Sequence, residues 1–203
     1  RSGVVRAESY PELFAAARLL AAGRLPRSNR LAVLTNGGGL GVLAADALEA
    51  RGGRLSVLSD ATLAALDRVL PGGWSRGNPI DILGDANGDR YRTALEVLAT
   101  EPDQDAVLVM NCPTGVADSG EGVDAVLAAR PDPKVPLLTA WVGEATAAAA
   151  RARLSGARLP AYETPDEAVA AFMRLVDHRR NQAALLETPP AGVSIPAAAS
   201  ARA

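Results

Sequence analysis

The stretch that decides the fold is LAVLTNGGGLGVLAADALEA, residues 31–50. Its first five residues form a short apolar run that is typical of a strand buried on both faces. Three consecutive glycines, Gly37 to Gly39, then allow a sharp turn, and residues 40–50 predict a helix closed by Gly52-Gly53. A buried strand, a tight turn and a helix begin a βαβ unit, so the stretch indicates a parallel sheet.

The same alternation continues along the chain, and further helices and strands are expected at regular intervals. Strands are predicted at 55–58, 106–111, 135–142 and 159–162, with a short extended core at 80–82, and helices at 60–70, 88–100, 119–130, 144–154 and 165–186. Parallel strands joined by right-handed helical crossovers give the expected fold class. It is α/β, a flavodoxin-like three-layer sandwich with about five parallel strands.

Three segments are expected. Residues 1–28 form an N-terminal lead-in with a helix at 10–22, for which Ser9 is placed as the N-cap. One face of that helix carries the apolar side chains expected to pack: Leu13, Phe14, Ala17, Leu20 and Ala21. Residues 29–187 form the flavodoxin-like domain, and the Pro- and Ala-rich residues 188–203 form a linker or tail.

The composition excludes several classes of function. The chain has 203 residues and a formal net charge of −2, which gives no basic field for nucleic acid. A single Cys excludes a disulfide framework, and a single His argues against a histidine-built metal site, so no metal is expected. No apolar run could cross a membrane and no signal peptide is visible, so the cytoplasm is the expected compartment. Because the chain starts at Arg1 rather than Met, we expect it to be excised from a longer protein.

The glycine turn is the first candidate site. Its backbone N–H groups and the N-terminus of the following helix suit a phosphate or a carboxylate. The glycine spacing does not match the dinucleotide fingerprint, because Val42 holds the last slot, and no Lys follows as a P-loop requires. The alternative interpretation is a tight strand-to-helix turn that binds nothing.

A second candidate site surrounds Asn78-Pro79-Ile80-Asp81. Asp81 is flanked by apolar residues at an expected strand end, where its carboxylate could accept hydrogen bonds from backbone amides or reach a substrate. Asp85 is expected to cap the helix near residue 88. The alternative is that both carboxylates only satisfy loop backbone.

Three other reactive side chains lack the context that catalysis needs. Cys112 follows the strand at 106–111, but no cation stands near it in sequence to activate a thiol, so a small buried thiol is expected. Ser75 matches the GxSxG nucleophile pattern without the strand–turn–helix context. His178 is expected on a solvated face near the end of the last helix. We therefore assign no catalytic residue to this chain.

Two motifs together resemble a known family. TNGGGLGVLAADALE at 35–49 is similar to the TNAGGPGVLATDALE signature of ADP-forming (NDP-forming) acyl-CoA synthetases, and NPIDILGDA at 78–86 is similar to their NPVDVLGDA segment. The resemblance spans residues 1–190 and identifies the region as the ligase-CoA domain, similar to the C-terminal domain of the succinyl-CoA synthetase β subunit. Gly replaces the family's Ala at 37 and Leu its Pro at 40, which makes the loop less rigid.

The resemblance implies roles for several residues. Family members convert acyl-CoA, NDP and phosphate to acid, CoA and NTP through a phosphohistidine. The loop residues Asn36, Gly37, Gly38 and Gly39 would bind that phosphohistidine or phosphate. Four others, Asn78, Pro79, Asp81 and Thr114, would line the adjacent acyl and phosphate pocket.

The remaining machinery would lie outside the chain. The family's SHTG motif with the phosphorylated His is missing here, so the phosphohistidine-bearing, CoA-binding and ATP-grasp domains of a parent enzyme are the expected partners. CoA, NDP or NTP, and Mg²⁺ would be cofactors of the parent enzyme and not of this domain. Two alternatives stay open: a regulatory or docking module of an acetyltransferase fusion that senses an acyl or nucleotide ligand, and a flavodoxin-like FMN protein.

Overall fold

The sheet has six strands, and all their pairings are parallel. The computed structural model describes residues 4, 7, 9–21, 25–129 and 135–186, so the expected tail at 188–203 lies outside the described residues. The strands are β1 (Arg30–Thr35), β2 (Arg54–Leu55), β3 (Ile80–Asp81), β4 (Ala106–Asn111), β5 (Leu137–Trp141) and β6 (Ala161–Tyr162). The four strands and the extended core at 80–82 that were expected after residue 50 are all present, mostly shorter than predicted.

The strand order confirms the flavodoxin-like class. Five strands follow the order β2-β1-β4-β5-β6, and β3 pairs with the far end of β1 beyond β2. Without β3 this is the 2-1-3-4-5 order of doubly wound flavodoxin-like sheets. The order reverses between β1 and β4, so the carboxyl ends of these two strands mark the switch point at which such folds bind ligands.

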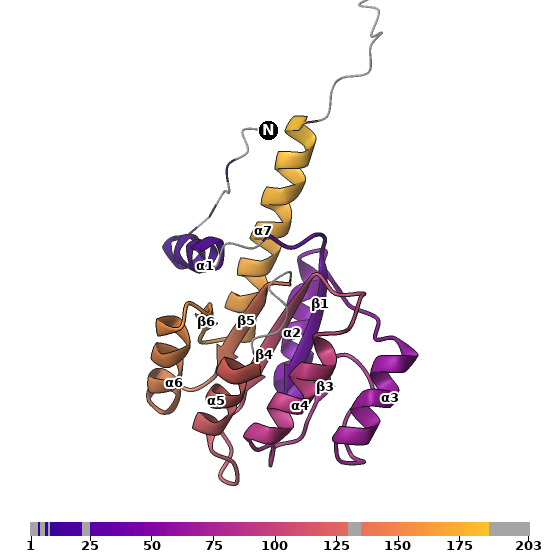
Figure 1. The fold of residues 1–203 in the computed structure, drawn as a ribbon. Helices are drawn as coiled ribbons and strands as arrows, with labels where there is room; N and C mark the ends of the chain where they lie inside the picture. The colour runs from indigo at the N-terminus through magenta and orange to yellow at the C-terminus, as the bar shows by residue number, and fades with distance from the viewer. Residues whose placement is uncertain (1–3, 5–6, 8, 22–24, 130–134, 187–203) are drawn as a thin grey trace, which may run out of the picture.

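Two helical layers cover the sheet (Figure 1). The helices are α1 (Tyr10–Ala21), α2 (Gly38–Ala50), α3 (Asp60–Val69), α4 (Gly88–Leu98), α5 (Ser119–Ala129), α6 (Glu144–Gly156) and α7 (Pro165–Leu186). One core joins the sheet to α3, α4, α5 and α6, and the other joins it to α1, α2 and α7. Strand residues alternate between the two cores, Val107 facing one and Leu108 the other, as the pleat requires.

The ends of two helices show how well local rules predict caps. Ser59 caps α3 by accepting a hydrogen bond from Thr62 N at 3.2 Å. The expected cap of α4 was wrong: Asn87 accepts from Arg90 N at 3.0 Å, while Asp85 pairs with the Arg90 guanidinium instead. Asp85 stands two residues before the N-cap position, whereas the residue directly before the first helical residue is the one placed to bond the free N–H groups.

The packing of α1 also differs from expectation. Ala15, Ala16 and Leu19 are buried against the domain, whereas Leu13 and Phe14 are 48% and 60% exposed. The buried stripe keeps helical spacing but consists of two alanines and one leucine, and it packs α1 against α7. Hydrogen bonds from Tyr162 Oη to the Ala15 carbonyl (2.9 Å) and from Arg18 to the Ala161 carbonyl (3.3 Å) fix this orientation. The face that was expected to pack therefore points to solvent.

The longest helix, α7, has 22 residues and runs past the edge of the sheet (Figure 1). Its first twelve residues are mostly buried, and its last six, 181–186, are exposed. Within the described residues, no helix is long and apolar enough to cross a membrane.

Candidate functional site

The glycine loop lies at the switch point, directly after β1. Gly37 is the N-cap residue of α2, and no side chain caps this helix. The N–H of Gly37 donates to Thr35 Oγ1 at 3.0 Å. A helix leaves its first N–H groups without intrahelical partners, so the exposed Gly38 and Gly39 carry the amides that can receive an anion. The loop thus offers two of the three glycine amides that the sequence suggested.

Asn36 connects the two strands that flank the switch point. Its side chain donates from Nδ2 to the Cys112 carbonyl at 2.9 Å and accepts from Cys112 N at 2.7 Å on Oδ1. The side chain is 2% exposed, and both its polar atoms are engaged. Asn36 therefore positions the loop against the end of β4, and its side chain is not free to bind a ligand.

Asn78 fills a gap in the sheet between β2 and β3. Its Oδ1 accepts from Val33 N at 3.0 Å, and its Nδ2 donates to the carbonyls of Leu31 (2.9 Å) and Ser56 (3.0 Å). The amide thus replaces a strand residue beside β1, and the peptide bond that follows, Asn78-Pro79, is cis. The structure places Asn78 beneath the expected pocket, with its amide committed to the sheet.

Pro79 and Asp81 lie directly against the glycines of α2. A Cβ added to Gly41 would stand 2.9 Å from Pro79 Cβ, and one added to Gly38 would stand 2.7 Å from Asp81 Oδ2. The other oxygen of Asp81 accepts from Leu83 N at 2.9 Å. An added Cβ at either position would force its neighbour to move, and a carboxylate oxygen lies beside the exposed start of α2.

The loop after β4 completes the rim. Thr114 Oγ1 donates to the Gly84 carbonyl at 2.8 Å and so joins this loop to the one after β3. Cys112 is half-buried, and a Cβ added to Gly37 would stand 2.9 Å from Cys112 Cβ. Seven of the eight predicted residues, all but Gly39, are thus tied by hydrogen bonds or close approaches to the loops and strands around the start of α2, and Gly39 is the second residue of that helix.

Two features around the rim had no functional prediction. Ser75 Oγ donates to the Pro79 carbonyl (2.7 Å) and accepts from Asp81 N (2.9 Å), so this hydroxyl braces β3. Arg90 donates to the Ile82 carbonyl at 2.9 Å and to Asp85 at 2.5 Å. The hydrogen bond from Arg90 is the main cause that holds the pKa of Asp85 below its ordinary value. Periodicity carries no information about either contact.

A buried polar pair lies below the rim. Tyr91 donates to the Met110 carbonyl at 3.0 Å, and Asn111 Nδ2 donates to Tyr91 Oη at 3.1 Å. Burial raises the pKa of Tyr91 far above its ordinary value. Nothing in the local sequence pattern separates this pair from the rest of the core, so the pair was not predicted.

The remaining reactive groups lie elsewhere. His178 is half-buried on α7, and within the described residues its buried Nδ1 has no hydrogen-bond partner. The expected solvated face is therefore only partly correct, because the side chain is half-buried. Among the described residues, no group of His, Cys, Asp and Glu side chains could hold a metal ion. Together these observations leave backbone amides, the Asp81 carboxylate, the Thr114 hydroxyl and the Cys112 thiol as the chemistry of the rim.

Fold and site define the class: a flavodoxin-like α/β domain with an uncapped glycine-rich helix N-terminus at its switch point. No family model matches the chain. It is 33% identical, over 86% of its length, to acetate–CoA ligase (ADP-forming) I subunit alpha of Pyrococcus furiosus and covers 38% of that protein. For the isoenzyme II subunit alpha of the same organism, the values are 31%, 89% and 40%.

A solved structure gives the same result. The apo form of dinucleotide-forming acetyl-coenzyme A synthetase 1 from Ca. Korarchaeum cryptofilum superposes with a TM-score of 0.85 at 30% identity. The match covers 92% of this chain and 42% of that one. The chain is therefore a relative of one region of the ADP-forming acetyl-CoA synthetases, and it spans about two fifths of the length of these relatives.

Proposed function

We propose that this chain is the ligase domain of an NDP-forming acyl-CoA synthetase, in which it receives a phosphoryl group carried by a histidine of another domain. The uncapped start of α2 at the switch point carries the proposal. Its Gly38 and Gly39 amides and the positive end of the helix dipole suit a phosphoryl group. Similarity to ADP-forming acetate–CoA ligases over 86–89% of the chain supports this assignment.

The domain stabilises charge and does not itself attack a substrate. The described rim offers backbone N–H groups, the Asp81 carboxylate, the Thr114 hydroxyl and the half-buried thiol of Cys112, without a histidine beside them. Preorganised donors of this kind act where negative charge develops in a transition state. The phosphorylated histidine, CoA, the nucleotide and Mg²⁺ belong in this proposal to other domains of a longer cytoplasmic enzyme. These are the phosphohistidine-bearing, CoA-binding and ATP-grasp domains.

Asp81 restricts what can approach the amides. Its Oδ2 lies against Gly38, so an incoming phosphoryl group meets a carboxylate as well as two N–H donors. A fully ionised phosphate is repelled there, whereas a ligand that also presents a hydrogen-bond donor can satisfy Asp81. A phosphohistidine whose second ring nitrogen is protonated offers both features. Its phosphoryl group suits the two amides, and its ring N–H can donate to Asp81.

Gly38 and Gly39 provide a matched pair of variants for the test. A Cβ at Gly38 would collide with Asp81 Oδ2, whereas a Cβ at Gly39 would meet nothing within 4 Å. In a longer synthetase that contains this chain, Gly38→Ala is expected to lower phosphohistidine formation by on the order of a hundredfold. Gly39→Ala is expected to keep it within about twofold. Equal rates for Gly38→Ala and the unaltered enzyme would remove the loop from the mechanism.

The isolated chain allows a second measurement. Phosphate titrated into the labelled chain is expected to shift the amide resonances of Gly38 and Gly39, with a dissociation constant of about 1 mM or weaker. Calorimetry with CoA and ADP serves as the comparison. Tight binding of either ligand to the isolated chain would instead favour a sensing module of an acetyltransferase fusion.

A further inference from the structure

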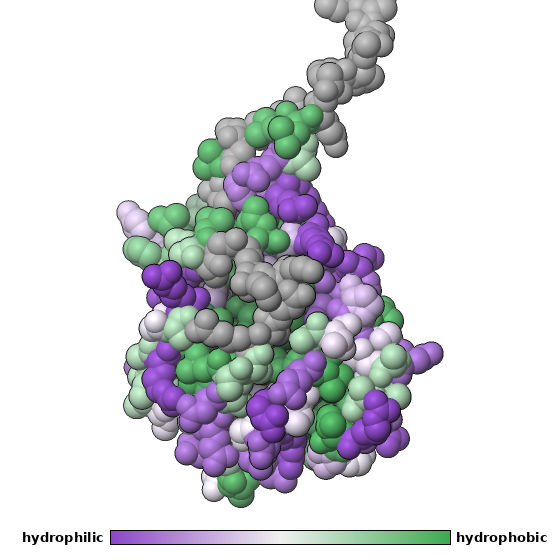
Figure 2. Space-filling model, viewed as in Figure 1, coloured by the Kyte–Doolittle hydropathy of each residue, from purple (hydrophilic) through white to green (hydrophobic). Residues whose placement is uncertain are grey.

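The outer face of α1 is an apolar surface that the proposed function does not use. Within twelve residues it exposes four large hydrophobic side chains, with Tyr10 79% and Phe14 60% exposed. Figure 2 shows hydrophobic residues gathered over this helix. Single exposed apolar residues are ordinary, but a continuous helical stripe of them marks an interaction surface. The α1 surface is defined as Tyr10, Leu13, Phe14, Ala17, Leu20 and Ala21.

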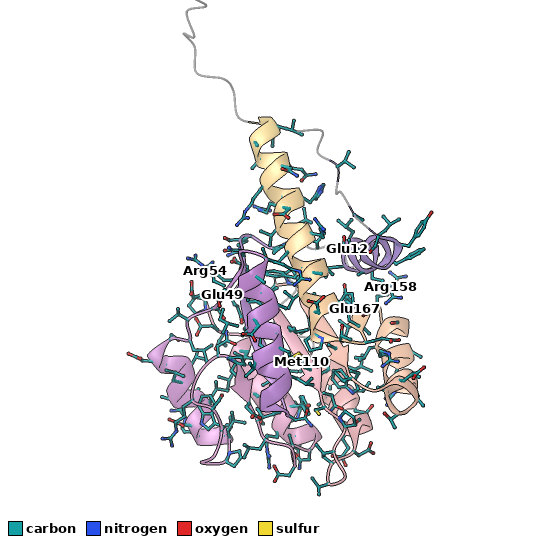
Figure 3. The ribbon with its side chains drawn as sticks, turned by 180° about the vertical axis from the view of Figure 1, so that it is seen from behind. Glu12, Glu49, Arg54, Met110, Arg158 and Glu167 are labelled. Carbon is teal, nitrogen blue, oxygen red and sulfur yellow. The ribbon has the colours of Figure 1, made fainter. Side chains whose placement is uncertain are left out.

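A groove continues this surface at the C-terminal end of α1. It has a volume of about 410 Å³ and lies between α1 and the end of α6. Its lining contains two arginines and no carboxylate: Arg18, Ala21, Ser155, Arg158, Leu159 and Pro160. Figure 3 shows Arg158 between α1 and α6. An apolar stripe thus runs into a cationic hollow.

The nearby acidic groups are already engaged. Glu12 pairs with Arg174 at 3.0 Å, Glu163 pairs with Arg151 at 3.2 Å, and Glu167 accepts from the backbone N–H of Glu163 at 3.2 Å. Within the described residues, neither Arg18 nor Arg158 takes part in an ion pair. None of these carboxylates lines the groove, so its two arginines can pair with the acidic side chains of an external partner.

From this arrangement we infer that the α1 surface and its groove dock an acidic amphipathic helix of a separate protein domain. The apolar stripe takes the hydrophobic side of that helix, and the two arginines take its carboxylates. A second copy of this chain fits less well, because symmetric pairing would bring arginines toward arginines. A lipid surface fits less well because the charged part is concave.

The surface is remote from the glycine loop. Arg18 and Tyr162 tie α1 to the outer strand β6, whereas the loop follows β1, which is three strands away from β6 in the sheet order. A helix docked on α1 thus leaves the start of α2 open. The inference does not depend on the proposed function, and the two can fail separately.

The test uses two synthetic fluorescein-labelled helices with Leu at heptad positions a and d. One carries Glu at its flanking positions and the other carries Lys. Fluorescence anisotropy with the whole 203-residue chain is expected to show binding of the Glu peptide and none of the Lys peptide. Amide shifts are expected to map to 10–21 and 155–160.

Two variants locate the contact. Phe14→Glu and Arg158→Glu are each expected to weaken binding of the Glu peptide by about tenfold or more. Both residues are exposed, so both variants should fold, which circular dichroism checks. The control is Val57→Glu, which alters a side chain that is 75% exposed outside this surface and is expected to leave binding unchanged.

Four results would overturn the inference. The first is the absence of binding by the Glu peptide, and the second is equal binding of the Lys peptide. The third is binding of the chain to vesicles of anionic phospholipid that Phe14→Glu abolishes. The fourth is a concentration-dependent dimer in sedimentation equilibrium that Phe14→Glu dissociates. The last two would assign the surface to a membrane or to a second copy.

Discussion

The two ends of the parallel strands are built from different chemistry. The amino-terminal ends form a charged edge of the sheet, and the carboxyl-terminal ends of β1 and β4 form a largely neutral edge. At the amino edge, Arg30 bonds the carboxylates of Asp103 and Asp105, and the 4% exposed Glu101 accepts from the Ser59 N–H at 2.9 Å. At the carboxyl edge of β1 and β4, neutral amides, hydroxyls and glycines join the loops, and the Asp81 carboxylate lies beside the start of α2. The fold places its buried ion pair at the amino edge, and at the carboxyl edge it presents backbone amides together with the Asp81 carboxylate where a ligand can approach.

The largest effect is expected from breaking the charged edge. Asp105 is fully buried at its side chain and holds Arg30 Nε at 2.8 Å, so Asp105→Ala leaves a guanidinium without its main partner. The free energy of unfolding is expected to fall by about 3 kcal/mol in urea titrations. The exposed Asp124–Arg153 pair is the control, and Asp124→Ala should cost at most about 1 kcal/mol. Equal losses would mean that burial does not distinguish the pairs.

The charged edge should also set the response to acid. Burial by itself would raise the pKa values of Asp105 and Glu101, but hydrogen bonds from Arg30, Ser59, Thr62 and Asp103 outweigh it and hold both values below the ordinary 3.8 and 4.5. A lowered pKa in the folded state adds stability above the ordinary value, and that stability is lost as pH falls toward the folded value. We expect a constant free energy of unfolding down to about pH 5, then a decline.

Asp105→Asn provides the check on this assignment. It removes one of the two carboxyl groups, so the decline between pH 5 and 2 should be shallower in urea titrations at several pH values. A decline of unchanged slope would place the acid sensitivity elsewhere in the molecule.

A smaller effect is expected at the neutral edge. Thr114→Val removes the hydrogen bond to the Gly84 carbonyl, which joins the loops after β3 and β4. The cost is expected to be about 1 kcal/mol, seen as a fall in Tm of roughly 2–4 °C. Thr100→Val is the comparison, because its exposed hydroxyl only bonds the Val97 carbonyl one turn earlier in α4. A loss at Thr114 as large as that at Asp105 would contradict the contrast between the edges.

The smallest effect is expected at Gly39. A Cβ there meets no atom within 4 Å, and Ala is the better helix former, so Gly39→Ala should raise the free energy of unfolding by at most about 0.5 kcal/mol. Thermal unfolding measures this change. A clear loss of stability would show that the start of α2 tolerates no side chain at all, and the contrast with Gly38 would disappear.

Much of the fold could be predicted from local patterns. The buried run at 106–111 and the opening of α7 at Pro165 are as expected. The site was predictable as a set of loops, because carboxyl ends of neighbouring parallel strands meet at one edge. What each side chain does there was not predictable. Asn78 completes the sheet and Asn36 joins two strands, through partners 22 to 76 residues away in the sequence.

The sequence by itself determined the alternation of strands and helices and the position of the glycine turn, because propensity and periodicity act between residues a few positions apart. The tertiary structure alone decided which face of α1 is buried, that Asn78 bridges β2 and β3, and that only Gly38 lies against Asp81. These features depend on groups from distant segments that come within a few ångströms of each other. Only the packing of the whole chain fixes that proximity.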